Sequence, residues 1–135
     1  MLTYSRRGSE MVTYVVDGSL SHKDGGARSQ LLRSGDFQLS SAHHSDHVSY
    51  SNASGRNEVH VVQLSLLVED PRRLRRPTER KSFPITNRVG SLHLVGSTDG
   101  RQGSLQLDQD VRLYSGVFDA GHELVYQLDP GRIAW

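Results

Sequence analysis

The sequence has 135 residues, a formal net charge of +1 and no cysteine. This length suits one domain of ordinary size with its own core. The charge gives the whole chain no strong field for nucleic acid or a membrane, and disulfides and thiolate metal sites are excluded. The first ten residues contain no signal-peptide core, and no apolar run reaches the ~18 residues of a membrane helix. We therefore expect a soluble, cytoplasmic protein.

Apolar and polar residues alternate along most of the chain, which predicts short β-strands. Residues 11–16 are mostly β-branched or aromatic, end at the turn Asp17-Gly18, and have a hairpin partner in residues 19–22. Further strands are predicted at residues 37–40, 58–68, 104–114, 122–128 and 132–135. Both faces of 58–68 are largely apolar, so we expect it to be covered on both sides. Without a helical period, this pattern predicts an all-β sandwich or barrel.

The segment from Pro71 to Arg88 has a different composition, with seven basic residues against one acid. Its three prolines argue against a regular strand or helix interior, so we interpret it as a linker. Its charge could bind a phosphate backbone. However, Phe83 is its only aromatic residue, so base stacking is unsupported and nucleic acid is not favoured.

Several stretches carry a family resemblance through their order and spacing. They are Glu10–Gly18 (EMVTYVVDG), Ser21–Asp24 (SHKD), Ser34–Gln38 (SGDFQ) with Ser41-Ala42, Val61–Leu67, Gly103–Asp110 (GSLQLDQD) with Leu113-Tyr114, and Pro130–Trp135. Together they resemble the pirin family of bicupins.

This resemblance implies a cupin-type β-barrel or sandwich that carries parts of two cupin modules. Residues 1–70 would be a partial N-terminal module, 71–88 the linker and 89–135 a partial second module. Family members extend beyond both ends of this chain, so we expect open sheet edges that pair with another chain. The expected assembly is a homodimer or strand-exchanged oligomer, in which the second barrel could be completed.

The family is described as metal-binding cupins, some acting as quercetin dioxygenases and some as nuclear transcription cofactors. Its iron is held by three histidines and one glutamate. The resemblance puts those four positions at Tyr4, Arg6, Val48 and Tyr50. Valine offers no lone pair, arginine stays charged and repels a cation, and tyrosine would make a different site. We therefore expect no family iron site, no cofactor and no dioxygenase activity.

The former metal pocket then becomes a candidate ligand pocket, lined by Tyr4, Arg6, Glu10, Val48 and Tyr50. Arg6 could bind an organic anion through a bidentate contact. Alternatively, Arg6 and Glu10 pair and fill the space that the metal leaves.

A dense histidine cluster follows the second motif. His43, His44 and His47, together with Asp46, could form a relocated site for iron, zinc or nickel. The alternative is an exposed polar loop.

Three functions stay open. The leading one is a degenerate pirin-like cupin that binds a small molecule or a protein. The second is a metal-dependent, quercetin-dioxygenase-like oxygenase with relocated histidines. The third is a transcription-associated interaction protein.

Overall fold

The computed structural model describes residues 2–5, 8–24, 28–41, 47–70 and 77–135, and strands dominate these ranges, which confirms the all-β prediction. The strands are β1 (Leu2–Ser5), β2 (Ser9–Asp17), β3 (Ser19–Asp24), β4 (Ser29–Arg33), β5 (Asp36–Ser41), β6 (His47–Asn52), β7 (His60–Leu67), β8 (Glu79–Ser82), β9 (His93–Ser97), β10 (Leu105–Gln106) and β11 (Leu113–Ser115). The described residues also include two short 3₁₀ turns, η2 (Ile85–Asn87) and η3 (Arg101–Gly103).

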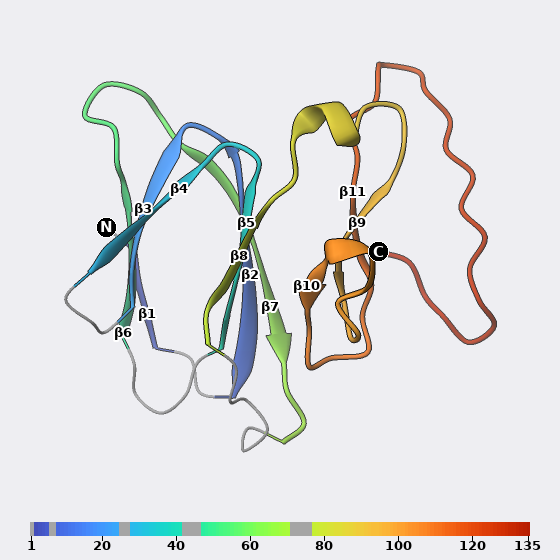
Figure 1. Ribbon diagram of the computed structural model, residues 1–135, viewed down its shortest axis with the longest axis horizontal. Coiled ribbons are helices and arrows are strands. Elements are labelled where there is room, and N and C mark those ends of the chain that lie inside the picture. Colours follow the sequence, from blue (N-terminus) through green and yellow to red (C-terminus); the bar gives the residue numbers. More distant parts are fainter. Residues whose placement is uncertain (1, 6–7, 25–27, 42–46, 71–76) are drawn as a thin grey trace.

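The strands form three sheets that lie in layers across the molecule (Figure 1). The first sheet has the order β1-β6-β3-β4, the central sheet β7-β2-β5-β8, and the third sheet β10-β9-β11. The first and central sheets form the N-terminal sandwich. The third sheet covers the other side of the central sheet, so the central sheet carries a buried face on each side.

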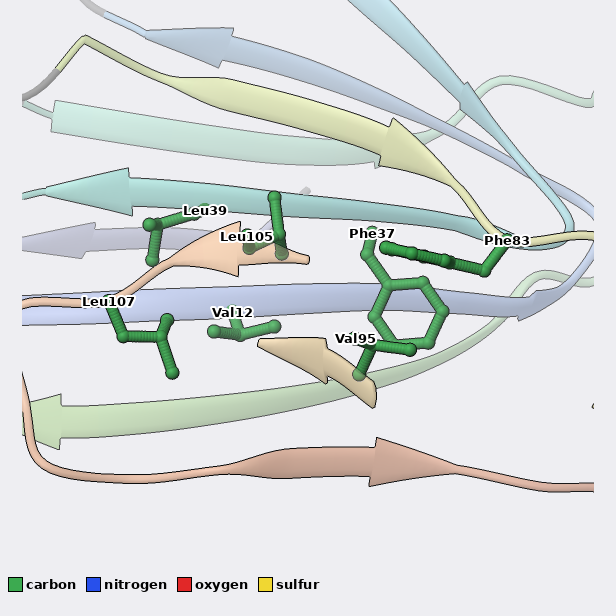
Figure 2. Packing of buried hydrophobic residues seen from close by; sticks show 7 residues of the cluster. All are labelled: Val12, Phe37, Leu39, Phe83, Val95, Leu105 and Leu107. Atoms are coloured by element: carbon green, nitrogen blue, oxygen red, sulfur yellow. The ribbon is translucent and has the colours of Figure 1, made fainter. Parts of the chain in front are cut away.

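β2 occupies the middle of this arrangement, and its sequence supplies both faces. Val15 packs toward the first sheet, in a cluster with Leu20, Leu32 and Tyr50. Val12, three residues earlier and therefore on the opposite face of the strand, packs toward the third sheet. The second cluster joins the central and third sheets (Figure 2) and comprises Val12, Phe37, Leu39, Phe83, Val95, Leu105 and Leu107.

Two glycines set the turns of the N-terminal sandwich. Gly18 has φ +83°, and a Cβ there would lie 2.6 Å from the carbonyl oxygen of Glu58. Gly35 has φ +89°, and its N–H donates to the carbonyl of Val15 at 2.9 Å. Left-handed backbone of this kind favours glycine, so both turn signals in the sequence have a local cause.

The expectation that residues 71–88 contain no regular strand is wrong, because Glu79–Ser82 forms strand β8. β8 pairs with β5 at the edge of the central sheet. Pro77 and Pro84 lie outside the strand on either side and leave its ladder intact.

The predicted strand over residues 104–114 is divided in two. β10 runs parallel to β9 on one edge, and β11 runs antiparallel to β9 on the other edge. The chain must therefore leave the sheet between Leu107 and Leu113 to cross β9, which no alternation pattern reveals.

Two further expectations about exposure are also corrected. Residues 122–128 form no strand, and Leu124, Tyr126 and Leu128 stay 42–47 % exposed. On β7, Val62 and Leu64 are 43 % and 44 % exposed, because the third sheet does not extend over this edge of the central sheet. Within the described ranges, no helix is long and apolar enough to cross a membrane; the compartment stays a prediction.

Candidate functional site

The interior of the N-terminal sandwich contains Tyr50, one of the predicted pocket residues. Its side chain is only 4 % exposed. The Thr13 hydroxyl donates to the Tyr50 oxygen at 3.5 Å, and the Tyr50 hydroxyl approaches the Met11 sulfur at 4.0 Å. Gln63 in turn donates to the Thr13 oxygen at 3.2 Å. The phenol is thus held inside the sandwich by neighbours from β2.

His22 extends this polar interior. Its ring is fully buried and stacks on Tyr50 with centroids 4.9 Å apart. Gln38 Nε2 lies 2.9 Å from His22 Nδ1 and donates to Gln30 Oε1 at 3.2 Å. Packing and hydrogen bonding therefore fix the imidazole in the core.

Glu10 has a different location from the one predicted. It is fully buried, and both of its carboxylate oxygens accept a hydrogen bond from the backbone N–H of Asp108, at 2.9 and 3.0 Å. It lies on the face of β2 that carries Val12, opposite the face of Met11 and Thr13. This placement corrects the expectation that Glu10 lines the same interior as Tyr50. It links the N-terminal sandwich to the chain that follows β10.

The other predicted pocket residues are only partly described. Val48 is half-buried and packs on the same cluster as Tyr50. The backbone of Tyr4 pairs with that of Val48 in the β1–β6 ladder, and His47 begins β6 opposite Ser5. Arg6, His43 and His44 lie outside the described residues. Among the residues that the structure describes, no group of three or more metal-ligand side chains is found.

Arg88 is a buried cation on the other side of the central sheet. It is 1 % exposed, and its Nη1 donates to the Tyr14 hydroxyl at 3.0 Å and to Ser115 Oγ at 2.7 Å. Its guanidinium lies 5.2 Å from the Tyr14 ring centroid and 5.7 Å from that of Phe37, close enough for cation–π attraction. In the described part of the chain, neither Nε nor Nη2 has an acceptor and no carboxylate pairs with the guanidinium.

Two other cations of the basic segment also have intramolecular partners. Arg80 pairs with Asp36 at 2.7 Å and donates to the carbonyl of Leu31. Lys81 pairs with Glu79 at 3.0 Å and donates to the carbonyl of Ser104 at 2.7 Å. These ion pairs and hydrogen bonds hold β8 against its neighbours. They reduce the positive charge that the segment could offer to a phosphate backbone.

A cavity of about 140 Å³ lies between the central and third sheets. Its walls are mostly apolar, with two hydroxyl groups at Tyr14 and Ser115 that both accept from Arg88. Tyr14 and Phe37 stack with centroids 4.2 Å apart and form part of the wall.

Ion pairs attach the C-terminal residues to the preceding loop. Arg132 reaches the carboxylate of Asp110 at 2.7 Å, and Arg112 reaches that of Asp129 at 2.8 Å. The hydrogen bond from Arg132 lowers the pKa of Asp110, and the bond to Asp129 raises the pKa of Arg112. These contacts are exposed and leave the apolar side chains nearby uncovered.

Comparison with known proteins matches the two ends of the chain to two described families. The family described as Pirin matches residues 2–66, and the Quercetinase C-terminal cupin domain matches residues 94–135. The chain is a pirin-family cupin. It is 28 % identical over 133 residues to a quercetin 2,3-dioxygenase of Escherichia coli K12, covering 98 % of this chain and 56 % of that protein. This pirin-family chain thus spans about half the length of the curated relatives that it matches.

Solved structures give the same fold assignment. YhhW from Escherichia coli matches with a TM-score of 0.72 and 30 % identity, over 83 % of this chain and 46 % of YhhW. The same TM-score is found for the bacterial pirin YhhW in complex with nickel(II), at 31 % identity, over 83 % of this chain and 46 % of that one. The three-layer arrangement is therefore a cupin-type β-sandwich of the pirin kind.

Two of the four positions that the resemblance gives to metal ligands have described side chains, Val48 and Tyr50. Val48 has no lone pair to donate, and the Tyr50 hydroxyl is engaged with Met11 and Thr13. A three-histidine, one-carboxylate site needs imidazole and carboxylate groups at these places. No step of metal chemistry can be derived from these two residues.

Sequence reasoning missed the group around Arg88. Arg88 was counted among the basic residues of the linker, and Tyr14 was treated only as part of a predicted strand. One signal was present in the sequence. Val12 and Tyr14 are large and lie on the face of β2 opposite Met11, Thr13 and Val15, which indicates that this second face is also covered. The contact with Ser115, 27 residues after Arg88, has no sequence signal.

Proposed function

We propose that this chain is a degenerate pirin-family module that does not hold the family iron and acts by binding a small molecule or a protein. The observation that carries the proposal is Tyr50. The resemblance puts the metal-binding carboxylate at this position, and here a buried phenol packs against His22 and contacts Thr13 and Met11. A phenol fixed in this way fills the interior and supplies no carboxylate to a cation.

The main alternative comes from the relatives. Proteins that match this chain are named quercetin 2,3-dioxygenases, and one neighbour binds nickel(II). An oxygenase built on this fold would need relocated ligands, for which His43, His44 and His47 are the candidates in the sequence.

Metal analysis separates the two functions. We expect the chain, purified without a histidine tag and incubated with Fe(II) or Ni(II), to retain less than a stoichiometric amount of metal. The positive control is the fourfold variant Tyr4→His, Arg6→His, Val48→His and Tyr50→Glu, which restores the family ligand set and should gain metal. Stoichiometric iron in the unaltered chain would overturn the proposal. Loss of that iron in a His43→Ala, His44→Ala, His47→Ala variant would then establish the relocated site.

We also propose that two copies of the chain associate. Large apolar side chains are uncovered in the C-terminal residues, including Val125 at 95 % and Ile133 at 76 % exposure and the fully exposed Trp135. β11 is an edge strand of the third sheet, and open edges with apolar neighbours favour pairing with a further chain. Light scattering at micromolar concentration tests this: we expect twice the mass of one chain, and a single-chain mass would rule the dimer out.

A further inference from the structure

We propose that the cavity between the central and third sheets is a binding site for a small aromatic carboxylate. This inference rests on the binding role proposed above and names its location and ligand class. The site is separate from the interior that contains Tyr50, because the two lie on opposite faces of β2.

The polar end of the cavity consists of two hydroxyl groups set by one cation. Tyr14 and Ser115 both line the cavity, and both oxygens accept from the same nitrogen, Arg88 Nη1, at 3.0 and 2.7 Å. The two hydroxyls are therefore neighbours. Each has its lone pair facing Arg88, so its hydrogen is available to an acceptor in the cavity. Among the described residues no acceptor for either hydrogen is found.

The charge of Arg88 makes a negative acceptor the preferred one. A guanidinium stays charged at physiological pH, and a buried charge without a counter-ion is strongly unfavourable. Arg88 is 1 % exposed, and two of its nitrogens have no acceptor in the described part of the chain. A carboxylate bonded to Tyr14 and Ser115 would lie one hydroxyl away from the guanidinium and would offset its charge. Hydrogen bonds in such a chain strengthen one another.

The rest of the cavity fits an apolar ring. Val12, Val62 and Leu64 contribute aliphatic walls, and the stacked rings of Tyr14 and Phe37 form an aromatic one. The volume is about 140 Å³, and a cavity of roughly 150 Å³ is large enough for benzene. Val62 and Leu64 are 43 % and 44 % exposed, so a ligand can enter beside β7.

The test uses sodium benzoate as the probe, titrated into the full chain by calorimetry. We expect saturable binding at one site per chain. Ser115→Ala and Tyr14→Phe each remove one hydroxyl and should weaken binding by about tenfold or more, the range for a hydrogen bond to a charged group. Ser65→Ala is the matched control, because Ser65 is exposed on β7 and does not line the cavity; it should bind like the unaltered chain.

Two further measurements make the outcome decisive. Benzyl alcohol has the same ring without the charge and should bind at least about tenfold more weakly than benzoate. Val62→Trp, which blocks the entrance, should abolish binding while the chain keeps its circular dichroism spectrum. The proposal is overturned if benzoate does not saturate, if the alcohol binds equally well, or if both hydroxyl variants bind like the unaltered chain. Iron content is measured on the same samples, so failure of the iron-free proposal would be seen separately.

Discussion

The two faces of β2 differ in what they leave available to a ligand. On the face toward the first sheet, Thr13 and Tyr50 contact each other and His22 stacks on the phenol. On the face toward the third sheet, Tyr14 contacts a buried cation beside a cavity. The resemblance puts the family's metal positions on the first face, whereas the binding site that we propose lies on the second. The two faces of one sheet thus offer different hydrogen-bonding groups to a ligand.

The largest expected effect concerns the cluster on the face of β2 toward the third sheet, which contains Phe37. Phe37 packs with Tyr14 and with Phe83, so Phe37→Ala should lower the free energy of unfolding by about 3–5 kcal/mol. Urea denaturation followed by fluorescence measures the change. Leu67→Ala is the control, since Leu67 is 81 % exposed and its loss should change the free energy by less than about 0.5 kcal/mol. Equal effects of the two variants would contradict the packing.

The link from β2 to the third sheet gives the next largest effect. Glu10→Gln replaces a buried carboxylate that accepts twice from the Asp108 N–H. We expect a loss of about 1.5–3 kcal/mol in unfolding free energy, the range for hydrogen bonds to charged groups. Glu58→Gln changes an exposed carboxylate and should be near neutral in the same urea titration. A neutral Glu10→Gln would mean that the two modules are not joined through this residue.

Substitutions on the face of β2 toward the first sheet should lower the stability less. Tyr50→Phe removes only the hydroxyl, whose contacts with Thr13 and Met11 are long at 3.5 and 4.0 Å. The expected cost is about 0.5 kcal/mol, at the low end for a neutral hydrogen bond, and thermal melting reports it. A much larger loss of stability would show that the phenol has a stronger hydrogen-bond partner than Thr13 and Met11.

The smallest effect concerns the C-terminal residues. Arg132 lowers the pKa of Asp110 below its usual 3.8, so the folded chain holds this carboxylate charged more readily than the unfolded chain does. The stabilising contribution is present above pH 3.8 and is lost as the pH falls through the lowered pKa. Amide chemical shifts near Arg132 should change over that acidic range. In Asp110→Asn the same shifts should no longer follow this titration; an unchanged titration would exclude the ion pair as its source.

Some expectations held because they rest on local chemistry. Gly18 and Gly35 need left-handed backbone at their turns, and each is preceded or followed by a polar turn residue that the sequence displays. Tyr50 and Val48 were expected on one strand face, and they share it. By contrast, Glu10 was expected beside Tyr50, although its position differs by an odd number from those of Met11, Thr13 and Val15, which face the first sheet.

The sequence by itself determined the all-β class, the N-terminal hairpin with its turns, and the family, because alternation and turn chemistry act between residues that are close along the chain. Only the tertiary structure decided which face of β2 meets which sheet, and that Arg88, Tyr14 and Ser115 come together. Those contacts join residues 27 and 74 positions apart. Their geometry depends on how three sheets stack, and sheet stacking is set by the whole core.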